Sequence, residues 1–233
     1  MKVKLASNYG FCFGVKRAIK IAEDYDNSAT MGPLIHNQDE INRLKNDFNV
    51  GLYTNLSDVK DNDTVIIRTH GIPKNDLKHL RTLNAKIINA TCPFVTTPQQ
   101  IVKKMSEEGY SILIFGDADH PEVKGVQSYA QNQDDVHIVL EPSDLENTIF
   151  KNNKIATVAQ TTKKKEKYLE IVNYLILKNK EVRVFNTICD ATFENQDAAR
   201  ELSKEVEIMI VIGGKNSSNT KQLHSICLEN CAD

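Results

Sequence analysis

An internal repeat is the feature that most constrains how this chain can fold. The segment that starts at Asn89 aligns without a gap with the segment that starts at Asn186. The identical pairs are Asn89 and Asn186, Cys92 and Cys189, Gln99 and Gln196, Ser106 and Ser203, Glu108 and Glu205, and Gly116 and Gly213. In each copy a cysteine precedes a predicted helix, and an apolar strand ends at the glycine. Such a repeat predicts modules with the same local fold.

The N-terminal region holds a shorter copy of the same pattern. Cys12 precedes a predicted helix over residues 15–22, as Cys92 and Cys189 precede theirs. In all three copies a polar residue follows the glycine by four positions: Gly32 and His36, Gly116 and His120, and Gly213 and Ser217. We therefore expect three modules, each made of a cysteine, a helix, a strand, a polar loop and a second helix.

Two of the copies continue into a further strand, polar turn and helix. The apolar runs 64–68 and 155–158 lead into Thr69-His70-Gly71 and Gln160-Thr161-Thr162. Short apolar strands that alternate with helices predict parallel sheets, with functional loops at the carboxyl ends of the strands. The predicted fold class is α/β, with three pseudo-threefold-related modules that have parallel sheets around a central metal site.

We place the modules at residues 1–88, 89–185 and 186–233. The third module has a predicted strand over residues 208–212 and no counterpart of the later strand, turn and helix. We therefore expect the chain to be incomplete at its C-terminus.

Charge and hydropathy exclude several classes of protein. The 233 residues carry 29 basic and 31 acidic side chains, so no global positive field would attract nucleic acid or an anionic membrane. The longest apolar run, 208–212, is too short to cross a bilayer, and no apolar stretch follows the N-terminal charges. We expect a soluble, cytoplasmic protein. Five cysteines without an export signal favour metal or redox chemistry over a disulfide framework.

Approximate threefold symmetry would bring Cys12, Cys92 and Cys189 to one axis. Clustered thiolates repel one another, so a bound cation must hold them together, and zinc or an iron-sulfur cluster are the candidates. A cubane cluster held by three cysteines leaves one iron without a protein thiolate, and this iron can act as a Lewis acid while the cluster supplies electrons. Zinc has no redox chemistry. Cys227 and Cys231, one helical turn apart, are assigned to a partly apolar helix face.

The polar loops supply many hydrogen-bonding groups and few cations. These residues are His36, His70, His120, Glu122, Thr161, Ser217, Ser218 and Asn219. Hydroxyl, amide and imidazole groups near helix N-termini suit a phosphate. Gly213-Gly214-Lys215 lacks the glycine spacing and the following Ser or Thr of a P-loop, which excludes an NTPase. The run Lys163-Lys164-Lys165 is expected to be a solvated face, and His79, His137 and His224 are expected to be ordinary surface or core residues.

These motifs resemble the 4-hydroxy-3-methylbut-2-enyl diphosphate reductase family of the methylerythritol phosphate route to isoprenoids. The resemblance covers nearly the whole chain. It is carried by Gly10-Phe-Cys12-Phe-Gly-Val15, His36-Asn37, Thr69-His70-Gly71, Ala90-Thr-Cys92-Pro93, His120-Pro-Glu-Val123, Gln160-Thr-Thr162, Cys189 with Ala191-Thr192, and Lys215-Asn-Ser-Ser-Asn219.

The resemblance implies a [4Fe-4S] cluster on Cys12, Cys92 and Cys189, which in air would appear as [3Fe-4S] or be lost. It implies reductive dehydroxylation of an allylic diphosphate to isopentenyl and dimethylallyl diphosphate, with ferredoxin or flavodoxin as electron donor. The diphosphate would be bound by His36, His70, His120, Ser217 and Asn219, with Ser218 close by. Glu122 would relay the proton and Thr161 would orient the hydroxyl.

The residues themselves support the role of Glu122, because it is the one carboxylate in the equivalent loops and a leaving hydroxyl needs an acid near it. The alternative is a non-catalytic iron-sulfur or zinc protein, a redox sensor or scaffold that uses the same three thiolates. Such a protein would have little use for the hydrogen-bonding groups.

Overall fold

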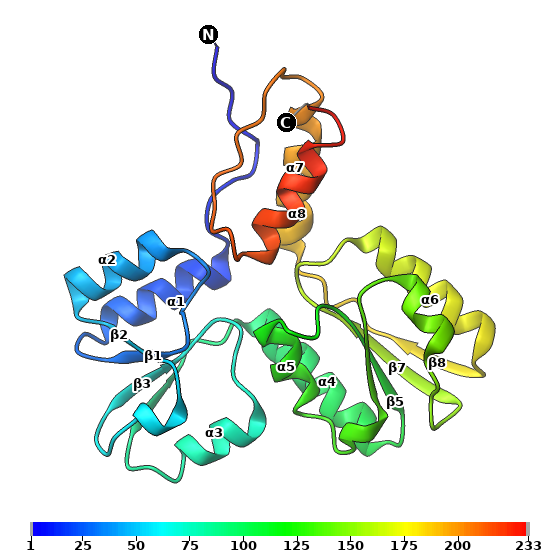
Figure 1. Cartoon of the computed structure of the whole chain (residues 1–233), viewed down its shortest axis with the longest axis horizontal. Helices are drawn as coiled ribbons and strands as arrows, with labels where there is room; N and C mark the ends of the chain where they lie inside the picture. Colours follow the sequence, from blue (N-terminus) through cyan, green and yellow to red (C-terminus); the bar gives the residue numbers. More distant parts are fainter. Residues whose placement is uncertain (1, 232–233) are drawn as a thin grey trace.

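The computed structural model describes residues 2–231 and contains two four-stranded sheets and a third, helical lobe (Figure 1). The first sheet has the order β2-β1-β3-β4. Its strands are β1 (Ala29–Met31), β2 (Gly51–Tyr53), β3 (Thr64–Ile67) and β4 (Lys86–Asn89). The helices around it are α1 (Phe13–Asp24), α2 (Gln38–Phe48) and α3 (Lys74–Leu80), with a short 3-10 turn η1 (Leu56–Asp58).

The second sheet has the order β6-β5-β7-β8. Its strands are β5 (Ser111–Phe115), β6 (Val136–Val139), β7 (Lys154–Ala159) and β8 (Glu181–Val184). The accompanying helices are α4 (Pro93–Glu107), α5 (Pro121–Gln127) and α6 (Lys165–Lys178), with 3-10 turns η2 (Gln133–Asp135) and η3 (Pro142–Asn147). The third lobe consists of α7 (Asp190–Ser203) and α8 (Ser218–Cys227).

The two sheets have the same topology. Every strand pair in both is parallel, and β1 relates to its neighbours as β5 does. Gly32 N–H donates to Tyr53 O and Gly116 N–H donates to Val139 O, both at 2.9 Å. The prediction of an α/β fold with parallel sheets is therefore confirmed. The exact module boundaries at 88/89 and 185/186 stay a prediction.

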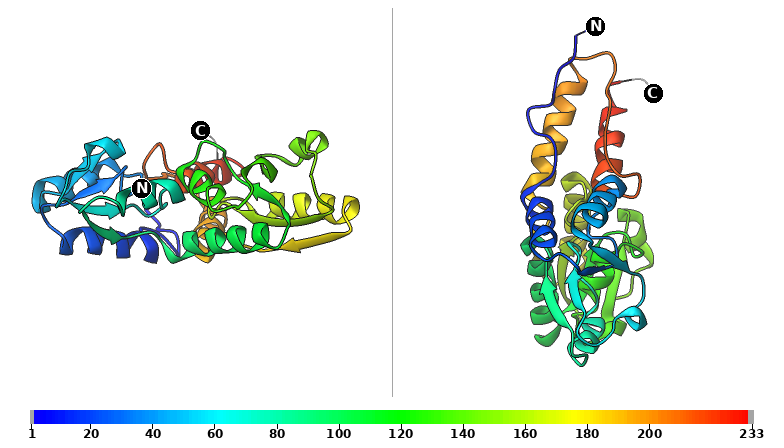
Figure 2. Two further views of the ribbon diagram at one scale, coloured as in Figure 1. Left: turned by 90° about the horizontal axis from the view of Figure 1, so that it is seen from below. Right: turned by 90° about the vertical axis from the view of Figure 1, so that its left-hand side faces the viewer.

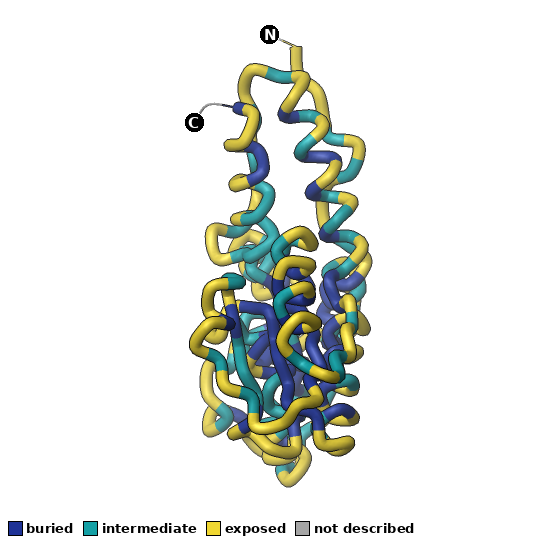
Figure 3. Tube along the Cα trace, turned by 90° about the vertical axis from the view of Figure 1, so that its right-hand side faces the viewer, coloured by how far each residue is buried: buried dark blue, intermediate teal, exposed yellow. Residues whose placement is uncertain are grey.

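The central strand β5 of the second sheet is buried along its whole length. All five residues of β5 are buried, because helices cover both faces of the sheet (Figure 3). Leu113 and Phe115 pack with Ile171 and Leu175 of α6. Alternate positions of the same strand form a second cluster with α4 and α5: Ile112 and Ile114 with Val102, Met105, Val123 and Val126. Residues on a strand point to opposite faces in turn, so each face has its own core.

The predicted strand over 208–212 is wrong. This segment is extended but forms no ladder within the described residues, and Ile208, Ile210 and Ile212 are 76%, 80% and 92% exposed. The N-terminal segment runs beside α7 (Figure 2), and Lys4 Nζ lies 2.9 Å from Glu205 Oε2, before the 208–212 segment. The alternating isoleucines fit a strand, but a strand forms only where neighbouring strands satisfy its backbone groups. The third lobe therefore has no sheet in residues 2–231.

Between residues 2 and 231, no helix is both long enough and apolar enough to cross a membrane.

Candidate functional site

The repeated cysteines occupy equivalent structural positions. Cys12, Cys92 and Cys189 are the N-cap residues of α1, α4 and α7. Their thiols make no capping hydrogen bond to these helices. The backbone N–H of Cys92 donates to Thr69 O and that of Cys189 donates to Thr161 O, both at 3.0 Å. The repeat therefore presents each sulfur at the positive end of a helix, which favours a thiolate.

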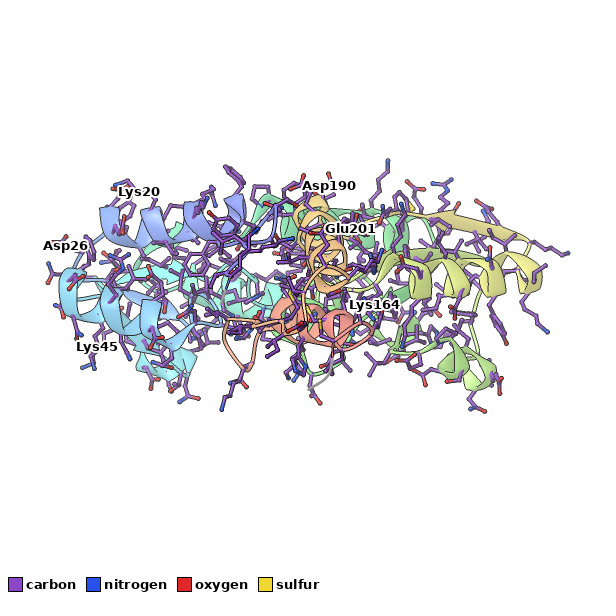
Figure 4. All side chains as sticks on the ribbon, turned by 90° about the horizontal axis from the view of Figure 1, so that it is seen from above. Lys20, Asp26, Lys45, Lys164, Asp190 and Glu201 are labelled. Carbon is purple, nitrogen blue, oxygen red and sulfur yellow. The ribbon has the colours of Figure 1, made fainter. Side chains whose placement is uncertain are left out.

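The cysteine side chains approach one another at the centre of the three lobes. A Cβ atom on Gly14 would lie 2.5 Å from Cys92 Sγ and 4.0 Å from Cys12 Sγ, so any larger residue here would displace the Cys92 side chain. Burial raises the pKa of Cys92 and of Cys189, and the proximity of Cys12 raises both further. Figure 4 shows Asp190, the residue after Cys189, in the middle of the molecule between the two sheets.

The spacing of the sulfurs bears on the two candidate metals. A tetrahedral zinc with Zn–S bonds of ~2.3 Å would bring its sulfur ligands to about 3.8 Å from one another. Among the described residues, the trio of possible metal ligands whose atoms lie within 4.8 Å of one another is His36, His70 and His120, and not the three cysteines. The three cysteine sulfurs therefore do not all lie within that distance of one another.

Three histidines from two sheets form a compact group. His36 precedes α2, His70 follows β3, and His120 is the N-cap of α5. Their ring centroids are separated by 4.6 Å (His36–His70), 5.2 Å (His70–His120) and 5.9 Å (His36–His120). His120 Nδ1 accepts a hydrogen bond from the Glu122 N–H at 3.2 Å, which leaves Nε2 for another partner. The structure therefore brings together all three predicted imidazoles.

Burial is the main cause that lowers the pKa of all three histidines. The pKa of His120 falls to about 4, and the pKa of His70 lies well below its ordinary value. Arg68 adds to the effect on all three pKa values, and neighbouring imidazoles add to it at His70 and His120, because they oppose a further positive charge. At neutral pH these rings are uncharged, so each offers one donor and one acceptor nitrogen.

Unpaired buried polar atoms concentrate at this group. Within the described residues, four buried side-chain atoms have no hydrogen-bond partner, namely His36 Nε2, His70 Nδ1, Gln196 Nε2 and Asn219 Oδ1. Three of these four belong to the predicted hydrogen-bonding residues. Because buried polar groups in folded proteins almost always have partners, this concentration is typical of a binding site for a polar ligand.

The start of α8 carries the remaining predicted residues. Ser217 is its N-cap and accepts a hydrogen bond from the Thr220 N–H at 3.3 Å. Ser218 Oγ accepts one from Thr162 Oγ1 at 2.8 Å. A Cβ atom on Gly214 would lie 1.7 Å from the carbonyl oxygen of His36, so the loop before α8 packs directly on the first lobe. This contact brings residues 217–219 to the histidine group.

Glu122 and Thr161 form a pair at the second sheet. The Thr161 N–H donates to Glu122 Oε1 and its hydroxyl donates to Oε2, both at 2.7 Å. Glu122 is 1% exposed. Burial raises the pKa of Glu122, although the two hydrogen bonds from Thr161 and the charge of Lys163 oppose the rise. A carboxyl group that retains its proton more readily than an exposed one suits a general acid.

Sequence reasoning did not identify Thr162 and Lys163 as residues of this region. Thr69 and Thr161 accept the equivalent cysteine N–H bonds, so the next residues, His70 and Thr162, hold equivalent places. Aligning the repeat on these threonines would have identified Thr162. The expectation that Lys163 is solvated is wrong, since its side chain packs by the Phe115 ring and only 8% of the residue is exposed. The helix starts later, at Lys165.

The histidines and cysteines that the sequence analysis did not assign to the site lie outside it. His79, His137 and His224 lie on α3, β6 and α8. Cys227 and Cys231 are buried, and Cys231 Sγ lies 3.2 Å from the carbonyl oxygen of Ser203, the last residue of α7. Cys227 is the last residue of α8, and Cys231 lies against the C-terminal end of α7.

The fold and the site together are typical of an α/β enzyme that holds a metal centre with thiolates and binds an anion beside it. The chain belongs to the LytB protein family, which matches residues 3–233. It is 64% identical over all 233 residues to 4-hydroxy-3-methylbut-2-enyl diphosphate reductase from Nitratiruptor sp. and covers 83% of that protein. The enzyme of that name from Campylobacter jejuni is 59% identical over 233 residues, also with 83% covered.

Solved structures agree with this assignment. The structure of an (E)-4-hydroxy-3-methyl-but-2-enyl diphosphate reductase, described as the terminal enzyme of the non-mevalonate pathway, matches with a TM-score of 0.75 and 42% identity. That match covers 97% of this chain and 83% of the other. The E-1-hydroxy-2-methyl-but-2-enyl-4-diphosphate reductase from Plasmodium falciparum matches with a TM-score of 0.89 and 28% identity, over 97% of this chain and 74% of that one.

Proposed function

We propose that this chain catalyses the reductive dehydroxylation of (E)-4-hydroxy-3-methylbut-2-enyl diphosphate to isopentenyl diphosphate and dimethylallyl diphosphate. Two electrons and two protons enter, the allylic C–O bond breaks, and water leaves. The observation that carries the proposal is the concentration of unpaired polar atoms on His36, His70 and Asn219, at a site that also holds the buried acid Glu122. Membership of the LytB family and relatives that carry this enzyme name support it.

Cys12, Cys92 and Cys189 would hold a [4Fe-4S] cluster at the N-termini of three helices. When bound, the cluster would supply the electrons and one iron without a protein thiolate as a Lewis acid. Ferredoxin or flavodoxin would deliver the electrons. We place the reaction in the cytoplasm, where thiols stay reduced.

The diphosphate would be bound by His36, His70, His120, Ser217 and Asn219, with Ser218 nearby. The neutral imidazoles donate hydrogen bonds, and the N-terminus of α8 adds a favourable dipole. Diphosphate charge would raise the pKa of the imidazoles, so that they take up protons as the ligand binds. This proton uptake would strengthen an otherwise neutral set of donors.

Glu122 would donate the proton that leaves with the hydroxyl as water. Its Oε2 is held by the Thr161 hydroxyl and its Oε1 by the Thr161 N–H. This pair of bonds fixes the plane of the carboxyl group, and the threonine hydroxyl would orient the substrate hydroxyl. A redox sensor or scaffold with the same thiolates would need neither the buried acid nor the unpaired donors, so this alternative is not favoured.

The test is product formation by anaerobically reconstituted protein. Cluster-loaded protein is mixed with the allylic diphosphate and reduced flavodoxin, and the products are separated by chromatography. The proposal predicts both isomeric diphosphates and no turnover by a Cys92→Ser control. Cluster-loaded protein that accepts electrons but leaves the substrate intact would refute the proposal.

A further inference from the structure

The exposed aromatic side chains of the molecule gather beside two of the cysteines. Within residues 2–231, the phenylalanines and tyrosines that are exposed are Tyr9, Phe11, Phe13 and Phe94, each between 39% and 67% exposed. Three of them lie within three positions of Cys12, and the fourth lies two positions after Cys92. Exposed aromatic side chains that are grouped in this way mark a surface that contacts another molecule. We call these four residues the aromatic patch.

The two segments that carry the aromatic patch are in contact. Arg17 on α1 donates from Nη1 to Thr91 O at 3.3 Å and from Nη2 to Asn89 O at 3.5 Å. Gly14, the residue after Phe13, lies against the Cys92 side chain. In the left view of Figure 2, α1 (blue) and α4 (green) lie along one edge of the molecule, and α8 (red) lies toward the other. The patch is therefore on the cysteine side, away from the start of α8.

The chain around the aromatic patch is cationic. Residues 2–22 and 89–106 contain no acid, and their cations are Lys2, Lys4, Lys16, Arg17, Lys20, Lys103 and Lys104. Four of these lysines have acidic partners from outside the two segments. Lys16 is exposed and, like Arg17, has no ion pair in the described part of the chain. The surface next to the patch therefore carries positive charge that is not neutralised within the molecule.

The third cysteine helix has the opposite charge and no exposed aromatic residue. The exposed acids of α7 are Asp190, Glu194, Asp197 and Glu201. Figure 4 shows Asp190 at the same edge of the molecule as Lys20 of α1. An approaching protein with an acidic surface would be attracted to the start of α1 and repelled by α7. This difference in charge along one edge favours a single orientation of such a partner.

We propose that the aromatic patch, together with Lys16 and Arg17, is the docking surface for an electron-transfer protein that is acidic around its redox centre. The inference deepens the function proposed above and rests on a cluster held by the three cysteines. In each encounter the donor loses one electron and the cluster gains it, so two encounters supply the two electrons of the reaction. Aromatic contacts and a few charges suit the small, transient interfaces of redox partners.

The position of the patch favours an electron donor over other partners. The rate of electron transfer falls steeply with distance, and Phe11, Phe13 and Phe94 are exposed residues next to the thiols of Cys12 and Cys92. The residues proposed to bind the diphosphate at the start of α8 lie on the other side (Figure 2). Donor and substrate therefore do not compete for the same surface.

The first experiment measures reduction of the cluster in the full chain by stopped-flow absorbance, without substrate. Phe13→Ser and Lys16→Glu should each lower the second-order rate constant with reduced flavodoxin roughly tenfold, and leave the rate with dithionite unchanged. The effect of Lys16→Glu should disappear at high salt, because salt screens exposed charges. Lys45→Glu on α2, at the opposite edge from Lys20 in Figure 4, reverses an equally exposed charge and should change neither rate.

A second measurement does not depend on electron transfer. The affinity of oxidised flavodoxin for the oxidised, cluster-loaded protein is measured at low salt from the flavin fluorescence. Phe13→Ser should weaken binding roughly tenfold, and Lys45→Glu should bind as wild type does. If these results hold while no variant turns over the allylic diphosphate, the docking surface stands and the proposed function fails.

Three results would overturn the docking surface. The first is turnover of the substrate with flavodoxin that Phe13→Ser and Lys16→Glu leave unchanged, which would keep the proposed function. The second is an equal loss of reduction by flavodoxin and by dithionite, together with a lower melting temperature, which would assign the aromatic patch to packing within the protein. The third is a dimer in sedimentation that Phe13→Ser dissociates, because a second copy would then cover the patch.

Discussion

The two sheets share a scaffold but differ in the chemistry of their loops. Both have the same strand order, and both fix a cysteine by an N–H bond to a threonine carbonyl. The first sheet contributes His36 and His70, two uncharged donors. The second contributes His120 together with the acid Glu122 and the cation Lys163.

This difference separates the residues that position the thiols from the residues that would take part in the proposed reaction. The shared scaffold sets where Cys92 and Cys189 lie, so it is alike in the two sheets. The loops are not constrained in this way and differ. In the proposed function, donors from both sheets would surround the anion, but proton transfer would belong to the second sheet alone. The following experiments test that division.

Glu122→Gln should give the largest effect among the loop variants. The amide keeps the shape of the side chain and one acceptor for Thr161, but it cannot donate the proton. We expect kcat to fall by roughly 10²- to 10⁴-fold with little change in KM, measured by anaerobic turnover. Near-normal kcat would place the proton source outside the second sheet and break the division.

His70→Asn should mainly weaken binding. Loss of a hydrogen bond to a charged group costs about 1.5 to 3 kcal/mol, so the affinity for the diphosphate should fall roughly ten- to hundredfold in calorimetric titration. His120→Asn should weaken diphosphate binding in the same way. Asparagine is a good N-cap residue, so α5 should still form. His137→Asn, on β6 outside the site, serves as the control. If His70→Asn lowered kcat as much as Glu122→Gln does, proton transfer would not belong to the second sheet alone.

The stability of the ligand-free protein should depend on pH through the histidines. An unfolded histidine binds a proton below pH 6.5, whereas His120 in the folded protein does so only below about 4. Between these values protons favour the unfolded chain, so stability is fully present above pH 6.5 and declines toward pH 4. The contribution of His120 is on the order of 1 to 3 kcal/mol.

Thermal unfolding between pH 7 and pH 4 should therefore show a shallower decline in His120→Asn than in wild type. His224→Asn, on α8 away from the group, should follow the wild type. Identical curves for all three proteins would mean that the histidine group does not hold its imidazoles neutral.

The sequence predicted what the repeat controls. Cysteines that precede helices are a local pattern, and Cys12, Cys92 and Cys189 are all N-caps. The polar residues four positions after the glycines lie at helix starts, His120 and Ser217 as N-caps and His36 one residue before the N-cap of α2. Burial of Lys163 could not be predicted, because it depends on Phe115 in a distant strand. The isoleucines at 208–212 have the right alternation for a strand, but strand formation depends on partners that a local pattern does not reveal.

The most direct test of the account is metal content after anaerobic reconstitution with iron, sulfide and zinc all present. Three thiols on equivalent helices around one centre predict about four irons per chain, and about three after brief exposure to oxygen, because the iron without a thiolate is lost first. Serine at Cys12, Cys92 or Cys189 should abolish the cluster, whereas serine at Cys227 or Cys231 should leave it intact. One zinc per chain without iron, or equal sensitivity of all five cysteines, would contradict the shared cluster.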